Sequence, residues 1–240
     1  MNYSRPAAKG RKVFGGLVPY DQVWRTGANE STKITFGGPI QFGGVEVPAG
    51  TYSLLSVPGQ NTWDVILSSN VELFGSYGYN PAEDVARVSA KPSQTNTPLE
   101  SLLLSFDAVV DDAAHLVIAW ENTQVAVPIS ADTQAVLVPQ IKAAMAADGD
   151  EKPYFAAAMY YYAKGIHLDQ AAQWMAKVVA QQPDAFWASY RQELVLAAAG
   201  DKAGARKAAQ SSIAKASAHD NKELREEYIR LNEALIASLE

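Results

Sequence analysis

The stretch Leu116-Val-Ile-Ala-Trp-Glu-Asn-Thr-Gln-Val-Ala-Val-Pro-Ile-Ser130 decides the fold, together with the change of pattern that follows it. Apolar side chains occupy every second position in two runs, Leu116/Ile118/Trp120 and Val125/Val127/Ile129. Such alternation predicts β-strands that bury one face. From Ala131 onward the apolar spacing becomes that of a helix, so we expect a domain boundary at residue 130.

The residues before this stretch also predict β-structure. The alternating runs are Ile34/Phe36, Tyr52/Leu54, Trp63/Val65/Leu67 and Leu102/Leu104/Phe106. Residues 1–130 contain 12 of the 16 Gly and 9 of the 12 Pro, which indicates many turns between short segments. We therefore expect residues 1–130 to form an antiparallel β-sandwich of about eight strands.

The residues after the boundary repeat a helical pattern. One predicted helix face carries Ala171, Trp174, Met175 and Val178, and a second carries Ala205, Ala208, Ala209 and Ser212. The two faces lie 34 residues apart, which is the period of tetratricopeptide repeats. Residues 131–240 are thus expected to form an all-α, tetratricopeptide-like domain that ends in a helix over Lys222–Leu239. The whole chain is then a two-part α+β protein.

Composition excludes several classes of protein. The net charge is −6, whereas a nucleic-acid binder needs a basic surface. Cys is absent, which excludes disulfides, thiolate nucleophiles, zinc ribbons and iron–sulfur clusters. No apolar run is close to the length of about 20 residues that a membrane-spanning helix needs.

Metal ligands and catalytic groups are also not apparent. The three histidines are never paired at helical spacing, whereas a zinc site needs three or four converging ligands. Asp107, Asp111 and Asp112 are candidates for a calcium site, but no calcium-loop glycine separates them, and a solvated hairpin turn is favoured. We expect no metal and no cofactor, and we assign no catalytic residue.

Charge is segregated within the predicted β-domain. Residues 1–33 contain six Lys or Arg against two acids, whereas residues 34–130 contain two against ten. The basic segment either places cations over a pocket for an anionic or polyhydroxylated ligand, or pairs with the acidic strands. Pairing is the favoured interpretation.

The segment Trp24-Arg-Thr-Gly-Ala-Asn-Glu30 is the strongest candidate for a binding site. Gly27 permits a tight turn that aims Arg25, Asn29 and Glu30 at one point, although an ordinary ion pair between Arg25 and Glu30 is favoured. Tyr77 and Tyr79 alternate around a glycine and line either a groove or a core edge. The candidate ligand-binding residues are Arg5, Lys9, Arg11, Trp24, Arg25, Asn29, Glu30, Tyr77 and Tyr79.

Several of these residues belong to longer motifs. The motifs are Val13-Phe-Gly-Gly-Leu-Val-Pro-Tyr20, Val23-Trp-Arg-Thr-Gly-Ala-Asn-Glu30, Pro48-Ala-Gly-Thr-Tyr-Ser-Leu54 and Gly75-Ser-Tyr-Gly-Tyr79. Through them, residues 2–129 resemble the family named domain of unknown function 2911. Members are mostly bacterial, frequent in the Bacteroidetes, and usually carry an export signal, so the resemblance implies a periplasmic or cell-surface protein whose leader is absent from this chain. Asp21 departs from the family pattern, in which many members have Gly, and we expect this turn change not to affect a site.

Two functions remain open. The first is a non-catalytic binding or assembly protein of the envelope, in which Tyr161, Trp174 and Trp187 anchor a protein or peptide partner and a small molecule or glycan is a further ligand. The alternative is a hydrolase of a carbohydrate or a phosphorylated small molecule, with Glu30 as the acid or base and a second carboxylate beside it.

Overall fold

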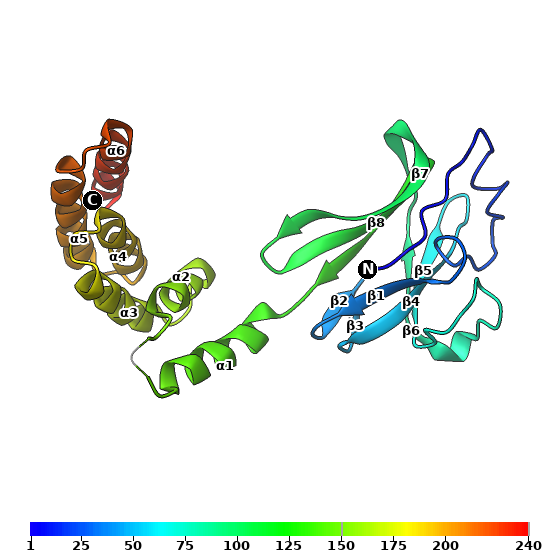
Figure 1. Cartoon of the computed structure of the whole chain (residues 1–240), viewed down its shortest axis with the longest axis horizontal. Helices are drawn as coiled ribbons and strands as arrows, with labels where there is room; N and C mark the ends of the chain where they lie inside the picture. Colours follow the sequence, from blue (N-terminus) through cyan, green and yellow to red (C-terminus); the bar gives the residue numbers. More distant parts are fainter. Residues whose placement is uncertain (150, 240) are drawn as a thin grey trace. The chain divides into compact units, whose positions relative to one another are not determined.

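The computed structural model describes residues 1–149 and 151–239, and contacts divide the chain into two compact units, Met1–Val136 and Leu137–Glu240 (Figure 1). The first unit contains β1 (Thr32–Phe36), β2 (Ile40–Phe42), β3 (Val45–Val47), β4 (Gly50–Val57), β5 (Trp63–Ser68), the short helix η1 (Pro81–Glu83), β6 (Asp84–Ala90), β7 (Ser93–Val110) and β8 (Ala113–Ser130). The helices are α1 (Thr133–Ala146), α2 (Tyr154–Lys164), α3 (Leu168–Gln181), α4 (Phe186–Ala198), α5 (Lys202–Ser217) and α6 (Lys222–Ser238). The division between the units falls inside α1.

The eight strands form two antiparallel sheets of four, in the orders β1-β4-β5-β6 and β3-β2-β8-β7. This arrangement confirms the predicted antiparallel strands and the two-part α+β organisation. One prediction of detail differs, because the two alternating runs within residues 116–129 belong to a single long strand, β8.

The break between those two runs lies at Glu121. This residue has a φ of +53° and lies opposite Leu99, where the register between β7 and β8 shifts. Between the pairs Gln94–Thr123 and Leu103–Ala119 the chain advances nine residues on β7 and four on β8, so the extra residues of this irregularity lie on β7. The polar segment 121–124 therefore interrupts the alternation without ending the strand.

The turn between β2 and β3 consists of Gly43 and Gly44, with φ values of +56° and +88°. A two-residue hairpin whose central residues both have positive φ favours glycine. Gly43 also lies against Val88 of β6, where an added Cβ would approach the Val88 side chain to 2.8 Å. This hairpin accordingly tolerates no side chain at Gly43.

Four aromatic side chains lie at the centre of the core of the first unit. Phe14 makes edge contacts with Trp24, Trp63 and Trp120, at ring-centroid distances of 6.0, 4.7 and 6.5 Å. Trp24 also stacks on Trp120 at 6.1 Å. Because Trp63 lies on β5 and Trp120 on β8, the cluster joins the N-terminal segment to both sheets. The core around it contains buried apolar side chains from both sheets.

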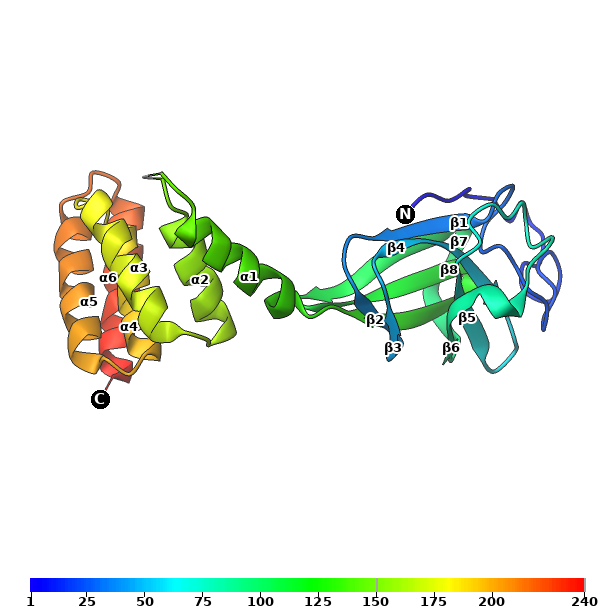
Figure 2. The ribbon, with the colours of Figure 1, turned by 90° about the horizontal axis from the view of Figure 1, so that it is seen from below.

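The helical unit is built from antiparallel hairpins, in which α2 packs on α3, α4 on α5, and α6 on α5 (Figure 2). Gly165, with a φ of +63°, ends α2, and Asp201 and Asn221 accept hydrogen bonds from backbone N–H groups at the starts of α5 and α6. The members of the predicted apolar faces are buried at Ala171, Met175, Val178, Ala205, Ala208, Ala209 and Ser212, and Trp174 is partly buried against the same core. No helix among the described residues has the length and apolarity needed to cross a membrane.

One acidic side chain is buried in the helical unit. Glu193 on α4 has no exposed surface, and neither of its carboxylate oxygens has a hydrogen-bond partner among the described residues. Burial raises the pKa of Glu193 to about 8, because an apolar environment disfavours the charged form. Glu193 is therefore mostly protonated at neutral pH in the folded chain.

Glu193→Gln should make the stability of the helical unit less dependent on pH. The folded chain keeps the Glu193 proton up to about pH 8, whereas the unfolded chain releases it near 4.5. The parent should therefore lose stability as pH rises between these values, by at most about 1.4 kcal/mol per pH unit. Thermal unfolding followed by helical circular dichroism across this pH range measures the difference.

Glu226→Gln is the matched control, because the Glu226 side chain is 64% exposed on α6. It should leave the pH dependence of the parent unchanged. If the melting temperatures of the parent and of Glu193→Gln depended equally on pH, this would contradict the conclusion that Glu193 is a buried carboxyl group with a raised pKa.

Candidate functional site

Two loops of the first unit lie next to each other. The loop of residues 69–80, which follows β5, covers the face of the sheet β1-β4-β5-β6 that is turned away from the main core, and the Trp24–Glu30 turn adjoins it. Beneath the loop of residues 69–80, Leu55 of β4 and Ile66 of β5 pack with Leu73 in a small apolar cluster. The loops are thus part of the folded structure of the first unit.

Buried hydroxyl groups fix both loops to the sheet. Thr26 Oγ1 is hydrogen-bonded to Ser56 Oγ at 2.9 Å, and Ser31 Oγ to Ser53 Oγ at 2.7 Å. Ser53 Oγ also donates to the Asn70 carbonyl at 2.7 Å. Each of these hydroxyl-bearing residues is at most 4% exposed. A buried hydroxyl costs free energy unless it is paired, so these contacts fix the positions of the two loops.

The two loops are also joined directly to each other. The Ser31 N–H donates to the Leu73 carbonyl and the Gly75 N–H to the Asn29 carbonyl, both at 3.0 Å. Glu30 and Phe74 form an antiparallel β-bridge. Opposite residues of such a bridge present their side chains on one face, so Glu30 and Phe74 are neighbours at the surface.

Arg25 and Glu30 have partners other than those expected from the sequence. Arg25 Nη1 donates to the Asn29 carbonyl at 2.9 Å. Glu30, whose side chain is 70% exposed, pairs with Lys33 at 3.3 Å. The contact of Arg25 is therefore a hydrogen bond to the main chain of its own turn, and the carboxylate of Glu30 stays at the surface.

Gly75 brings Arg25 and Tyr77 close together. An added Cβ on Gly75 would lie 3.0 Å from Arg25 Nη1 and 3.3 Å from Tyr77 Cδ2. The φ of Gly75 is +71°, a conformation that side chains other than glycine rarely adopt. The structure thus brings together four of the predicted ligand-binding residues, Arg25, Asn29, Glu30 and Tyr77.

A surface hollow of about 270 Å³ lies beside Glu30. Its lining is polar and consists of Asn2, Tyr3, Ser4, Asn29, Glu30, Ser31 and Lys33. Glu30 is the only carboxylate among these lining residues, so the hollow does not contain the pair of acids that the hydrolase hypothesis requires. Asn2, Ser4 and Lys33 were not predicted as site residues.

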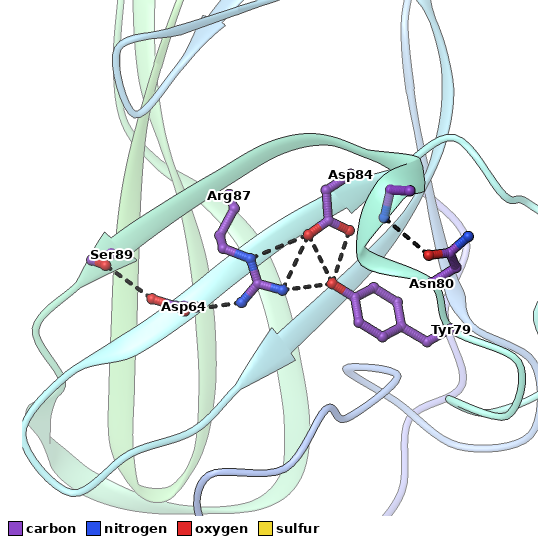
Figure 3. Close-up of polar contacts among 7 residues, drawn as sticks. Asp64, Tyr79, Asn80, Asp84, Arg87 and Ser89 are labelled. Atoms are coloured by element: carbon purple, nitrogen blue, oxygen red, sulfur yellow. Dashed lines mark hydrogen bonds and ion pairs between the residues drawn. The ribbon is translucent and has the colours of Figure 1, made fainter.

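Trp24 and Tyr79 lie away from this hollow. Trp24 is 9% exposed in the aromatic core, and its Nε1 donates to the Gly27 carbonyl at 3.2 Å. Tyr79 points toward Asp84 and Arg87 (Figure 3). Trp24 therefore anchors the turn rather than lining the hollow.

Tyr79 belongs to a polar network on β5 and β6 (Figure 3). Its hydroxyl donates to Asp84 at 2.7 Å and accepts from Arg87 Nη2 at 2.5 Å. Arg87 also pairs with Asp84 at 3.1 Å and with Asp64 at 3.0 Å, and Ser89 Oγ donates to Asp64 at 2.9 Å. Burial and the hydrogen bond to Asp84 raise the pKa of Tyr79 to about 12, so its hydroxyl stays protonated at neutral pH.

Arg87→Met should lower the free energy of unfolding by about 1–2 kcal/mol, because the Asp84 carboxylate would lose its cation. The Asp84 side chain is only 11% exposed, so water replaces that cation poorly. Thermal unfolding should show a melting temperature about 2–8 °C below that of the parent.

Lys222→Met is the control for this change, since Lys222 and Glu226 form a pair whose side chains are 73% and 64% exposed. Its melting temperature should match that of the parent. Equal effects of the two variants would mean that the Arg87 network contributes no more than a surface pair.

Arg25→Ala should lower the free energy of unfolding by about 1 kcal/mol, which is the usual contribution of one hydrogen bond. Breaking a buried ion pair would instead lower it by about 3–5 kcal/mol. Glu30→Gln should cost less than about 1 kcal/mol, because its pair with Lys33 is exposed. Differential scanning calorimetry of both variants tests the two values. A loss of several kcal/mol in Glu30→Gln would mean that this carboxylate has a structural role.

The remaining basic candidates lie along the edge strand β7. Arg5 Nε donates to the Leu102 carbonyl at 3.0 Å, and the backbone N–H of Lys9 donates to Glu100 at 2.7 Å. Arg11 donates to the carbonyls of Ala7 and Ala8, both at 2.9 Å. These guanidinium groups hold the N-terminal segment in place and do not line the hollow beside Glu30.

The helical unit contains a second candidate surface. Tyr161 and Trp174, whose rings are 5.1 Å apart, line a hollow of about 380 Å³. Its other lining residues are Lys142, Met145, Ala146, His167 and Gln170. Trp187, the third predicted anchor, contacts Phe155 at 5.3 Å and does not line this hollow.

The described residues contain no group of three or more His, Asp or Glu side chains that could hold a metal ion. Of the three aspartates weighed as calcium ligands, Asp107 accepts a hydrogen bond from the Ala108 N–H and Asp112 one from Thr133 Oγ1. The contact of Asp107 fits a hairpin turn, and the contact of Asp112 fits the start of α1 at Thr133.

The first unit is thus a pair of antiparallel sheets on which residues of the N-terminal segment and of β1 line a polar hollow. The chain belongs to the family described as "Protein of unknown function (DUF2911)", which matches residues 1–129. Searches of curated proteins and of solved structures found no match.

Asp21 lies at a turn with an unusual backbone conformation. This residue has a φ of +60°, and its N–H donates to the Pro58 carbonyl at 2.8 Å. Glycine adopts this conformation without cost, and Asp and Asn are among the side chains that tolerate it best. The turn is therefore compatible with Asp as well as with glycine at this position.

Proposed function

We propose that this chain is a non-catalytic binding protein of the cell envelope, and that its helical unit holds a protein or peptide partner. The observation that supports this proposal most directly is the hollow of about 380 Å³ in which the half-buried Trp174 lies against the buried ring of Tyr161. Aromatic side chains in a hollow are typical anchors of protein interfaces.

The helices of this unit are proposed to be tetratricopeptide-like repeats. α3 begins at Leu168 and α5 at Lys202, 34 residues later, and each follows a shorter antiparallel helix. Ala171 and Ala205 are both fully buried at equivalent positions, which allows the paired helices to approach closely. Stacked repeats of this type form extended surfaces suited to peptides.

The β-domain is proposed to be a sandwich. Its core includes buried side chains from both sheets, as two sheets packed face to face require. Such a domain would support the loops of the first unit on a rigid base. The envelope location rests on the family resemblance, whose members usually carry an export signal.

The hollow of the helical unit favours a particular kind of peptide. Trp174 and Met145 offer an apolar surface, and Lys142, His167 and Gln170 place polar groups at its border. An apolar side chain of an extended peptide would bury itself there, while the peptide backbone would bond to the polar border.

The hydrolase alternative has less support. Asp64 and Asp84, the acids of the Arg87 network, pair with Arg87 and do not line the hollow beside Glu30. Glycosidase chemistry of the usual kind needs two carboxylates that flank one bond. The arrangement around Glu30 favours binding rather than hydrolysis.

A random-peptide phage library selected on the full-length chain tests the proposed function. Selected peptides should bind Trp174→Ala at least about tenfold more weakly than the parent, a change that corresponds to about 1.4 kcal/mol. Fluorescence anisotropy with a labelled peptide measures the dissociation constants.

Trp187→Ala is the matched control, because it removes a half-buried tryptophan of the same unit outside the hollow. It should bind the peptides as the parent does, provided that circular dichroism shows both variants folded. Equal binding by Trp174→Ala and the parent would reject this hollow as the partner site.

A further inference from the structure

Two large aromatic side chains stand exposed on the loop of residues 69–80. Phe74 is 62% exposed and Tyr77 is 80% exposed. Exposed aromatic groups gain nothing from hydrophobic burial, so two of them on one short loop indicate contact with another molecule.

The backbone around these residues is fixed. Leu73, the neighbour of Phe74, is 5% exposed in the small apolar cluster beneath the loop. Tyr79, two residues after Tyr77, bonds to Asp84 and Arg87, and Gly75 bonds to the Asn29 carbonyl. The loop thus presents Phe74 and Tyr77 from an ordered base, which reduces the entropy lost on binding.

The polar hollow lies beside Phe74, because Phe74 pairs with Glu30 across the β-bridge, and Tyr77 lies three residues further along the same loop. The hollow offers hydrogen-bond groups of every kind: the amides of Asn2 and Asn29, the hydroxyl of Ser4, the carboxylate of Glu30 and the ammonium of Lys33. Its volume of about 270 Å³ is near the lower end of small-ligand pockets, which are about 300–1,000 Å³.

The charges of the hollow indicate a neutral ligand. Its one cation, Lys33, already pairs with its one anion, Glu30, at 3.3 Å. The nearby guanidinium of Arg25 donates to the Asn29 carbonyl. A phosphate or carboxylate ligand would need Lys or Arg side chains that do not already pair with groups of the protein itself.

We propose that Phe74, Tyr77 and the polar hollow beside Glu30 bind a neutral carbohydrate. A sugar ring has an apolar face of C–H groups and a rim of hydroxyls that both donate and accept hydrogen bonds. The two exposed rings fit the apolar face, and the amide, carboxylate and ammonium groups fit the rim. This site lies in the first unit and does not depend on the function proposed for the helical unit.

A protein partner is the competing occupant of an exposed aromatic patch. Protein interfaces have a continuous apolar core that is depleted of charged groups. Here Phe74 adjoins a small hollow whose lining is polar and includes a charged pair, and Tyr77 follows on the same loop. This composition favours a carbohydrate.

An array of neutral oligosaccharides, built from glucose, xylose, mannose, galactose or N-acetylglucosamine units, tests the proposal with the full-length chain. The parent should bind at least one of them, and calorimetry with that oligosaccharide should then give about tenfold weaker binding for Phe74→Ala and for Tyr77→Ala. Glu30→Gln should also bind more weakly.

Phe106→Ala is the matched control, because Phe106 is 48% exposed on β7 and lines neither hollow. It should bind as the parent does, and so should Trp174→Ala, which separates this site from the helical one. Absence of binding to every oligosaccharide overturns the proposal, and so does binding that Phe74→Ala and Tyr77→Ala leave unchanged. Capture of a protein that Tyr77→Ala abolishes, without any bound glycan, overturns it in favour of a protein-docking surface.

Discussion

The aromatic cluster of Phe14, Trp24, Trp63 and Trp120 is the contact on which the first unit depends. Residues 1–31 form only isolated bridges and no strand, so the sheet hydrogen bonds alone do not fix their path. Phe14 and Trp24 bury their rings against tryptophans of both sheets. Aromatic side chains bury more apolar area than other residues, and this burial offsets the entropy of ordering the segment. The Trp24–Glu30 turn then begins from a fixed point.

The second requirement is that both faces of β4 be partly polar. A fully apolar strand would allow an apolar loop to pack in many registers, whereas Ser53 on one face and Ser56 on the other pair only with loops that bring a hydroxyl or a carbonyl to the right place. Leu55 and Ile66 supply the apolar contact on the face of Ser53. The combination fixes both loops in one arrangement and leaves their outer side chains free to contact a ligand.

The sequence predicted the regular elements well and the site only in part. Alternation at residues such as Trp63, Val65 and Leu67 is a direct consequence of one buried face, so β5 and the other alternating strands were predictable. The sequence also brought Arg25, Asn29 and Glu30 into one candidate turn. It could not show that Arg25 bonds to a main-chain carbonyl, because Glu30 offers a more obvious partner at similar spacing. Phe74 was missed because a Leu-Phe pair before a glycine also fits a buried segment.

The two halves of the helical unit share a backbone pattern but differ in chemistry. In the first half, the half-buried Trp174 lines a hollow and lies against the ring of Tyr161, which is 1% exposed. In the second half, the positions 34 residues later are Val195 and Ala208, two smaller side chains that are both buried. Ser189 of α4 and Lys215 of α5 also join these two helices with a hydrogen bond of 2.8 Å. In the proposed repeats, the same backbone pattern would thus provide a binding surface in one copy and a compact support in the next, because the size of the side chains at the helix contact decides how closely the helices pack.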